Sequence, residues 1–453
     1  MAEHARDHLG DGQPNDSEAS TGEASADLAS EFEDAVEQGD RPIAPGSFRA
    51  VLAGRDFRYA FTGAVVSNIG TWMQTVVLAA FAYDLTGSAI FVSLVAFANL
   101  VPQLLFSLPG GTLADSVDRR RVVIWATVWQ MVFSFGLAAM VTQTDPARAP
   151  LLLLVFAVGI GNAVQAPAYS ALLPTLVPRD AIQGAISLSS ANFNLSRVIG
   201  PAIGGVLYST VGASWVFALN GLTFFVMIFA MRKVDAPLPH RSAEDPSAVR
   251  RLLTGFTTAK RDPVLWRSIT VMGLFSLACM GFVTQFPVQA SENFGISTDS
   301  PVYGLLYATL AGGSLVGALG IGFLFKNRPL EQLVRLSLIG FAITLLLYGA
   351  VHSPVLAFPA AFLLGINYFA VITSTMTVLQ RRVDDAVRGR VVAVAMMAVG
   401  GALPVGSLIA GWIVEASDVS VVCVVGSICA VLLALYADMR DHTPGDTTVA
   451  PAS

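Results

Sequence analysis

The chain has 453 residues, of which 54% are hydrophobic and only 13% are charged. The apolar residues lie in long runs rather than at the intervals of an amphipathic surface helix, which excludes an ordinary soluble domain. The three cysteines fall inside these runs without metal-ligand spacing, so we expect neither a disulfide framework nor a metal site.

Residues 1–47 form an acidic segment with twelve aspartates and glutamates but only two arginines, although the whole chain carries a net charge of only −5. Large apolar residues are scarce here, so we expect a disordered tail that is either simply solvated or binds a partner. The segment lacks the basic and apolar regions of a secretory signal.

The apolar runs predict twelve transmembrane helices, because a helix needs about 20 mainly apolar residues to cross a bilayer. The expected spans are 59–83, 89–113, 122–142, 150–173, 185–209, 213–231, 265–290, 302–325, 332–351, 354–377, 390–413 and 419–437. A β-barrel is disfavoured, since its strands are about ten residues long and alternate in polarity. The expected fold class is therefore an all-α membrane protein.

Basic residues in the predicted loops indicate the orientation, because loops that stay in the cytoplasm retain Lys and Arg. With the N-terminus inside, the outer loops contain Arg148 as their one base and carry acids such as Asp84 and Glu292. We therefore expect a multi-pass protein of the cell (inner or plasma) membrane with both termini in the cytoplasm.

The spans divide into six and six. The longest internal break is a polar linker. Two segments of the first half recur in the second: Asp180–Gly184 resembles Asp385–Gly389, and Ile160–Asn162 resembles Ile366–Asn367. Both matches have an offset of 205 residues, the second to within one residue. Such parallel repeats of six helices place a substrate site at the midplane between the halves. The predicted divisions are an N-terminal bundle at 48–232, a cytoplasmic linker at 233–263, a C-terminal bundle at 264–438 and a cytoplasmic tail at 439–453.

The loop after the second span reads Gly111-Thr-Leu-Ala-Asp115-Ser-Val-Asp118-Arg119-Arg120-Arg121. It resembles the signature loop of the major facilitator superfamily, and departs from it at Ser116 and Asp118, where a base and a glycine are usual. The resemblance implies a cytoplasmic gate, in which Gly111 lets two helices approach and Asp115 pairs with a base or a helix N-terminus in one conformation only. The alternative, a topology signal, explains Arg119, Arg120 and Arg121 but neither Gly111 nor Asp115.

The fifth span contains Arg197-Val-Ile-Gly200-Pro201-Ala-Ile-Gly204-Gly205, which resembles the Gly-Pro-x-x-Gly-Gly signature of the antiporter branches of that superfamily. There the motif is associated with export; ordinary small-residue packing is the alternative. Further likeness, over nearly all of 48–438, is to the branch that holds the enterobactin exporter, macrolide efflux proteins and transmembrane secretion effectors. It implies two pseudo-symmetric six-helix bundles that export a small amphipathic molecule, a drug, siderophore or other metabolite, by alternating access.

Arg197 is the one basic residue well inside a predicted span, and charges at that depth usually face a cavity or a partner. Two interpretations stand side by side. Arg197 binds an anionic substrate group or a carboxylate, or it bonds neighbouring carbonyls and stabilises the bundle.

Polar residues recur at helical spacing on the first, fourth and seventh spans, which line the cavity together with the tenth in the superfamily. The candidates for substrate contact are Asn68, Trp72, Asn162, Gln165, Gln285, Gln289 and Asn367. The alternative is that these side chains form hydrogen bonds between helices.

Proton antiport requires a carboxyl group that titrates in the pathway. Asp84 and Glu292 end the first and seventh spans in equivalent places, and either serves if partial burial raises its pKa. Solvated carboxylates at the membrane surface are the alternative.

Other functions are less well supported. An uptake symporter of the same fold, or a non-transporting receptor or assembly factor, would leave the antiporter-like motif or the repeat unexplained. A nucleotide-binding loop and a nucleophile paired with a base are missing from the sequence, so neither an enzyme nor a cofactor is expected. The expected partners are a small molecule, protons and the lipid bilayer, with no nucleic acid, and the expected state is a monomer.

Overall fold

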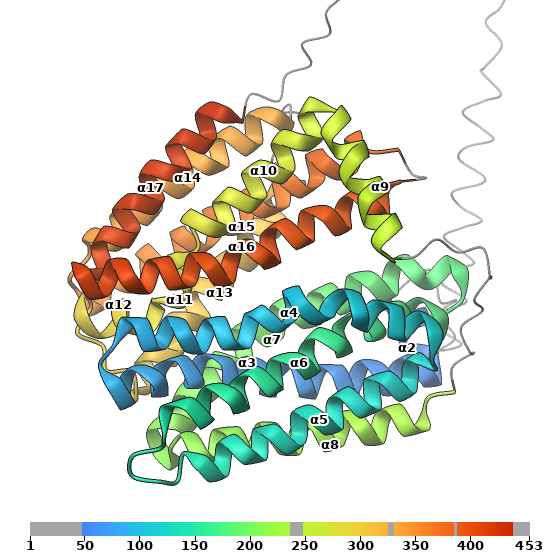
Figure 1. The fold of residues 1–453 in the computed structure, drawn as a ribbon, viewed down its shortest axis with the longest axis horizontal. Helices are drawn as coiled ribbons and strands as arrows, with labels where there is room; N and C mark the ends of the chain where they lie inside the picture. The colour runs from blue at the N-terminus through green and yellow to red at the C-terminus, as the bar shows by residue number, and fades with distance from the viewer. Residues whose placement is uncertain (1–47, 236–247, 325–329, 385–386, 438–453) are drawn as a thin grey trace, which may run out of the picture.

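The computed structural model describes residues 48–235, 248–324, 330–384 and 387–437, and within these ranges the chain forms helices and no strand (Figure 1). The predicted acidic tail, part of the linker and the whole C-terminal tail lie outside these residues.

The N-terminal half consists of a short helix and six long ones. The bounds are α2 (Phe48–Ala53), α3 (Arg55–Thr86), α4 (Ala89–Ser116), α5 (Arg119–Met140), α6 (Arg148–Leu172), α7 (Ile182–Val211) and α8 (Ala213–Lys233), with the 3-10 turns η1 (Leu173–Leu176) and η2 (Arg179–Ala181) before α7.

The C-terminal half begins with a helix inside the linker. The bounds are α9 (Ala248–Arg261), α10 (Pro263–Ala278), α11 (Gly281–Thr284), α12 (Phe286–Glu292), α13 (Pro301–Leu324), α14 (Leu330–Ala350), α15 (Pro354–Arg382), α16 (Arg388–Ala416) and α17 (Val419–Tyr436).

Eleven stretches of the described chain are long and apolar enough to span a bilayer. The twelfth crossing is α7, whose 30 residues include Asn192, Asn194 and Arg197. These polar residues lower its hydropathy, but its length still exceeds the roughly 20 residues that a crossing requires. The prediction of an all-α protein with twelve crossings in two six-helix bundles is confirmed.

The seventh crossing differs from the single span expected at 265–290. It is broken into α10, α11 and α12, and Gln285 lies at the second break. Pro287 lies in the first turn of α12, where its missing N–H is tolerated, so it begins a helix instead of continuing one. The break changes the direction in which the side chains on either side of it point.

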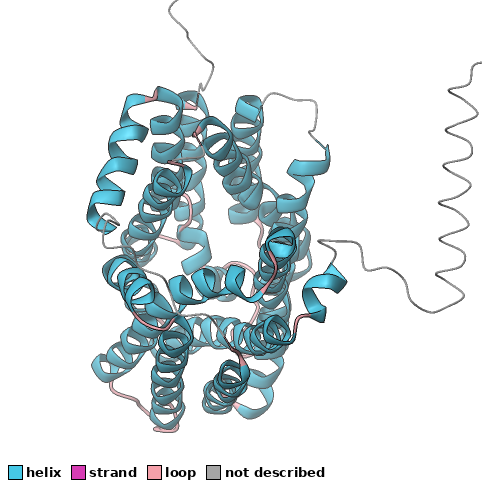
Figure 2. Ribbon diagram, turned by 90° about the vertical axis from the view of Figure 1, so that its right-hand side faces the viewer, coloured by secondary structure: helices cyan, strands magenta, loops and turns pink. Residues whose placement is uncertain are grey.

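The two halves meet along two helix pairs. Helix α4 packs against α16 and α7 packs against α13, each pair combining one helix from each half. In Figure 1 the halves converge on the left and diverge on the right. Figure 2 looks from the diverging side and shows the helices of both halves nearly end-on. We call the converging end, with Asp84, Glu292 and Glu415, the acidic end, and the other, with Arg119–Arg121 and Arg382, the basic end.

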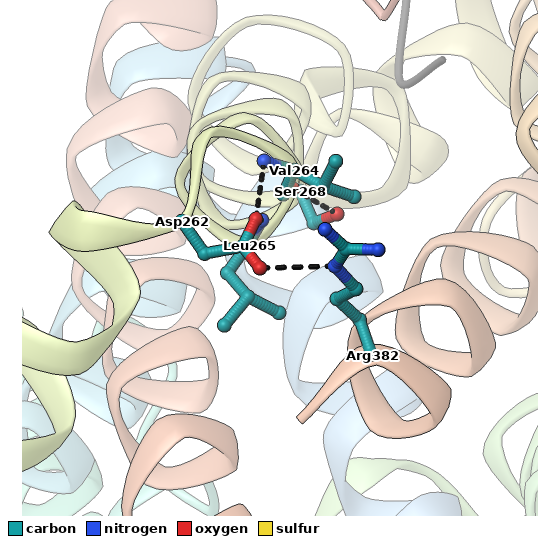
Figure 3. A network of polar contacts seen from close by, with 5 residues as sticks. All are labelled: Asp262, Val264, Leu265, Ser268 and Arg382. Atoms are coloured by element: carbon teal, nitrogen blue, oxygen red, sulfur yellow. Dashed lines mark hydrogen bonds and ion pairs between the residues drawn. The ribbon is translucent and has the colours of Figure 1, made fainter. Parts of the chain in front are cut away.

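A polar network at the basic end joins α10 to α15. Asp262 caps α10 by accepting hydrogen bonds from the N–H groups of Val264 (2.9 Å) and Leu265 (3.4 Å) (Figure 3). Its other oxygen accepts one from Arg382 Nε at 2.9 Å. The carboxylate thus satisfies the first turn of α10 and fixes the end of α15 beside it.

Candidate functional site

A cavity of ≈ 520 Å³ lies within the N-terminal half, among α3, α4, α6 and α7. Its lining is rich in amides and hydroxyls and includes no charged side chain: Ala64, Ser67, Asn68, Thr71, Trp72, Thr75, Asn99, Leu100, Gln103, Asn162, Gln165, Ala166, Tyr169, Ser170, Ser189, Phe193 and Met227. Polar, neutral walls suit a molecule with several hydrogen-bonding groups and apolar surface between them.

Four of the seven predicted contact residues lie together in this cavity, namely Asn68, Trp72, Asn162 and Gln165. The amide of Gln165 is held from behind by α5. Gln130 Nε2 donates to Gln165 Oε1 at 2.7 Å, and Gln165 Nε2 donates to Thr127 Oγ1 at 3.2 Å. Since Thr127 and Gln130 are fully buried, this network fixes the position of Gln165.

The other three predicted contact residues bond elsewhere in this conformation. Gln285 Nε2 donates to Ser93 Oγ on α4 at 2.6 Å, and Gln289 Nε2 donates to Tyr348 O on α14 at 3.4 Å. The two glutamines are four residues apart, but the break at the start of α12 directs them to different neighbours. Asn367 donates to Leu363 O at 3.0 Å within its own helix and contacts Gly340 on α14.

The cavity also contains residues that the sequence reasoning missed. Asn99 and Gln103 come from α4, and Ser189 and Phe193 come from α7. Both pairs have the spacing of four that places two side chains on one helical face, so the same signal was present in the sequence.

Arg197 lies in the middle of α7 and is 5% exposed. Its guanidinium carbon is 5.6 Å from the ring centre of Trp72, 5.6 Å from that of Tyr368 and 4.6 Å from that of Phe369. The side chains of Tyr307 and Tyr368 interact with its charge, and its Nε has no hydrogen-bond partner.

Neither protein partner considered for Arg197, a carboxylate or a backbone carbonyl, is found among the described residues. Within the described ranges, no carboxylate forms an ion pair with this guanidinium and no backbone carbonyl accepts from it. Three of its four aromatic or phenolic neighbours belong to the C-terminal half. Arg197 is therefore a buried cation between the two halves, surrounded by rings.

The glycines that follow Arg197 lie where helices approach most closely. A Cβ built at Gly200 is 2.7 Å from Ile69 O on α3, and one built at Gly204 is 2.9 Å from Met73 Cγ on the same helix. At Gly205 the Cβ is 2.7 Å from Gly304 Cα on α13, in the other half. The Gly-Pro-x-x-Gly-Gly motif thus packs α7 against one helix of each half.

Carboxylates at the acidic end join the two halves through hydroxyl groups. Asp84 on α3 accepts hydrogen bonds from Tyr208 Oη at 2.5 Å and, across the interface, from Thr298 Oγ1. Beside it, Glu292 on α12 accepts one from Tyr83 Oη at 3.0 Å. The contacts of the two predicted proton-coupling residues thus involve adjacent residues of α3, Tyr83 and Asp84.

A third carboxylate repeats this arrangement between α16 and α4. Glu415 Oε2 accepts a hydrogen bond from Ser88 Oγ at 3.1 Å and one from Ile90 N at 3.4 Å. Deeper in the interface, Ser93 Oγ donates to Ser407 O at 2.7 Å. Hydroxyls donate more strongly to an ionised carboxylate than to a neutral one, so the contacts of Glu415 depend on its charge.

The predicted gate motif lies at the basic end. Arg119 donates to Ala171 O at 3.0 Å near the end of α6, and Arg120 donates to Arg232 O at 3.2 Å near the end of α8. Arg121 forms an exposed ion pair with Asp118, the N-cap of α5, at 3.5 Å. Arg119 and Arg120 thus bond helix C-termini, where carbonyls lack partners.

The close helix approach was expected at Gly111, but in the structure it occurs at Gly110. A Cβ built at Gly110 is 3.1 Å from Val164 Cα on α6, whereas one built at Gly111 has no atom within 4 Å. The reason is the helical rotation of about 100° per residue, which points adjacent residues to different neighbours. The side chain of Asp115 lies outside the described part of the structure, so its predicted pairing stays a prediction.

Comparison with known proteins assigns the family. Residues 46–449 match the family of transmembrane secretion effectors. The staphyloferrin A transporter of Staphylococcus aureus is 26% identical over 78% of this chain and 88% of its own length. The enterobactin exporter EntS of Shigella boydii serotype 4 is 27% identical over 76% of this chain and 80% of its own length.

Solved structures share the fold. The nucleoside transporter NupG has a TM-score of 0.69 at 11% identity, and the match covers 85% of this chain and 98% of its own. A bacterial homologue of the human lysosomal transporter Spinster, in an inward-facing and unoccupied conformation, has a TM-score of 0.64 at 15% identity, over 84% and 96% of the two chains. With two six-helix halves, a polar cavity and this match, the chain belongs to the transmembrane secretion effector family of major facilitator transporters.

Proposed function

We propose that this transporter exports a small amphipathic molecule by alternating access, driven by proton entry. The observation that carries the proposal is the polar cavity of ≈ 520 Å³ in a molecule whose halves diverge at one end and are hydrogen-bonded at the other. A site that is closed on one side and can open on the other is what alternating access requires.

The direction follows from charge and from the fifth crossing. Loops that carry Lys and Arg stay in the cytoplasm, which assigns the basic end to the cytoplasm and the acidic end to the outside. The conformation described above then faces inward and is ready to take cargo from the cell. Gly200, Pro201, Gly204 and Gly205 favour export through their likeness to antiporter branches.

The relatives suggest the class of cargo. One transports staphyloferrin A and the other exports enterobactin, so a siderophore or a comparable metabolite is the first class to test here. The amides and hydroxyls that line the cavity would bind the many oxygen atoms of such a molecule.

Asp84 and Glu292 are the proposed proton carriers. Each accepts a hydrogen bond across the interface at the acidic end. When the pH outside falls and these carboxylates become protonated, the bonds to Tyr83, Tyr208 and Thr298 weaken. Protonation from outside therefore favours separation of the halves at the outer end. Net proton entry then requires that the protons leave Asp84 and Glu292 toward the cytoplasm, and their loss favours closure of the outer end.

The cytoplasmic gate is proposed for the other end. Arg119, Arg120 and Arg121 begin α5 beside the end of α4 that carries Gly111 and Asp115. In the outward-facing state the two halves would meet here, and Asp115 would then pair with a base or a helix N-terminus of the other half.

Transport into everted membrane vesicles with an imposed pH gradient tests the proposal. We expect the gradient to drive accumulation of at least one compound from a panel of lipophilic antibiotics and siderophores. Accumulation that ignores the gradient would reject proton coupling, and accumulation of no compound would reject export for those classes. Uptake of the same compounds by intact cells would support a symporter instead.

A double variant tests the carriers. Asp84→Asn with Glu292→Gln keeps the side-chain size but cannot titrate, so we expect transport that no longer responds to the gradient. Asp145→Asn, on an exposed loop of the same side, is the matched control and is expected to behave as the wild type. Full gradient dependence in the double variant would show that neither residue carries the essential proton.

A further inference from the structure

Arg197 is the feature that the proposed transport cycle leaves unused. Arginine stays charged at all physiological pH values, so its burial places a permanent cation between the two halves. Rings whose centres are 4.6 to 5.6 Å away attract the cation, but these contacts restore only part of the hydration free energy that the guanidinium loses on burial. The described residues offer it no negative charge, and its Nε is left without a hydrogen bond.

The cation lies directly behind one wall of the cavity. Trp72 lines the cavity and also contacts the guanidinium, and its ring packs edge-on against Phe193 at 5.7 Å. Phe193 precedes Arg197 by four residues on α7, so the two side chains lie on the same helical face. Movement of the Trp72 and Phe193 rings would bring a molecule in the cavity into contact with the cation.

The lining of the cavity has no charge that competes with Arg197, which lies behind it. This lining offers amides, hydroxyls and the three aromatic rings of Trp72, Tyr169 and Phe193, but no carboxylate and no base. A cationic guest would meet the field of Arg197 without a compensating anion, whereas an anionic guest would neutralise it. The electrostatics of this site therefore select the sign of the cargo.

We infer that Arg197 binds the cargo's anionic group, and that the cargo is an organic oxyanion carried on an aromatic ring that packs against Trp72 and Phe193. The inference rests on the proposed transport function and gives its cargo a chemical class. The contacts of Arg197 with Tyr307, Tyr368 and Phe369 add a consequence. When the cargo's anionic group neutralises this cation, the interactions of Arg197 with the C-terminal half change. Binding of cargo in the N-terminal half therefore alters the contacts between the two halves.

Binding of a charged and an uncharged probe tests the inference on the purified full chain. Radiolabelled 2,3-dihydroxybenzoate is the anion, and 2,3-dihydroxybenzamide is its uncharged counterpart of nearly the same shape. We expect the wild type to bind the anion at least tenfold more tightly than the amide. Equal affinities, or no measurable binding of the anion, would overturn the assignment without any need for a variant.

Variants then locate the charge. Arg197→Gln is expected to bind the anion at least tenfold more weakly while its affinity for the amide stays the same. Arg197→Lys, which keeps the charge but loses the planar fork, is expected to fall between the two. Arg179→Gln removes one charge from the exposed basic end and should bind as the wild type does. An Arg197→Gln protein that is folded and binds the anion normally would reject the role of Arg197.

Efflux of the same probes from proteoliposomes separates this inference from the proposed function. Selective binding of the anion without transport would leave the anion site standing and reject export of this probe. Transport of anion and amide alike, unchanged in Arg197→Gln, would support export and reject the anion site.

Discussion

Gln165 shows how a single side chain can belong to the cavity and to the packing of the bundle at once. Its amide faces the cavity, and its two hydrogen bonds to Thr127 and Gln130 fix it to α5. Gln165→Leu would remove the bond that each of these buried partners makes with it. Neither partner is left unpaired, because Thr127 also donates to Val123 O at 2.7 Å and Gln130 to Ala126 O at 3.3 Å. The loss is therefore that of two hydrogen bonds between membrane helices, which average about 0.6 kcal/mol each.

We therefore expect Gln165→Leu to lower the free energy of unfolding by about 1 kcal/mol, in addition to any loss of binding. Gln103→Leu is the matched control, because Gln103 lines the same cavity but is exposed and has no hydrogen bond to another described residue. Thermal unfolding in detergent measures both. Equal destabilisation by the two substitutions would contradict a structural role for the Gln165 network.

The same residues mark what the sequence can predict at this scale. Periodicity places Asn68 with Trp72, and Asn162 with Gln165, on shared faces, and both pairs line the cavity. It does not say which neighbour a face meets. Asn367 occupies the repeat position of Asn162, yet it lies against α14, because the cavity is confined to the N-terminal half and the two halves are not equivalent.

At the level of helices, the glycines of the α7 motif make two kinds of contact, one within their own half and one with the other half. The sequence motif alone does not show which glycine makes which contact. Gly200 and Gly204 contact α3 in their own half, while Gly205 contacts Gly304 of α13 in the other half. Because the halves must move relative to each other during transport, the second contact is the one that tests the mechanism.

Gly205→Ala places a methyl group 2.7 Å from a backbone atom that cannot move aside. Overpacking of this kind costs about 1–3 kcal/mol, and here it pushes α7 away from α13. We expect lower thermal stability and a severe loss of transport. Gly312→Ala on α13 is the control, since it has no atom within 4 Å and replaces a helical glycine by a better helix former. If both variants transport normally, the contact is not a pivot.

The seventh crossing shows a limit of prediction from hydrophobic runs. Run length predicts where the chain crosses the membrane, because burying apolar residues in lipid depends on composition alone. It does not predict where a helix breaks, because the break depends on Pro287 and on the packing of Gly281 against Ala410 of α16. The directions of Gln285 and Gln289 could therefore not be read from their spacing.

For the whole molecule, the repeat and the loop charges predicted two bundles of six helices with a substrate site between them, whereas the polar cavity lies within the N-terminal half. They did not predict how the bundles are tilted relative to each other, since both states of an alternating-access cycle have the same sequence. The tilt depends on contacts between residues far apart in the chain. Asp84 with Thr298 and Ser88 with Glu415 are such contacts at the acidic end.

Pulsed electron paramagnetic resonance on spin-labelled protein tests whether these contacts set the tilt. One label pair replaces exposed Arg179 and Arg381 at the basic end, and the other replaces exposed Ser209 and Ser417 at the acidic end, both in a background without the three native cysteines. As the pH falls and the carboxylates are protonated, their hydroxyl contacts weaken. The distance at the acidic end should then lengthen while the distance at the basic end shortens, because each half moves as one body. In the Asp84→Asn and Glu292→Gln double variant both distances should respond less to pH. Two distances that lengthen together would indicate loosening of the bundle, and would contradict a rocking motion controlled by these carboxylates.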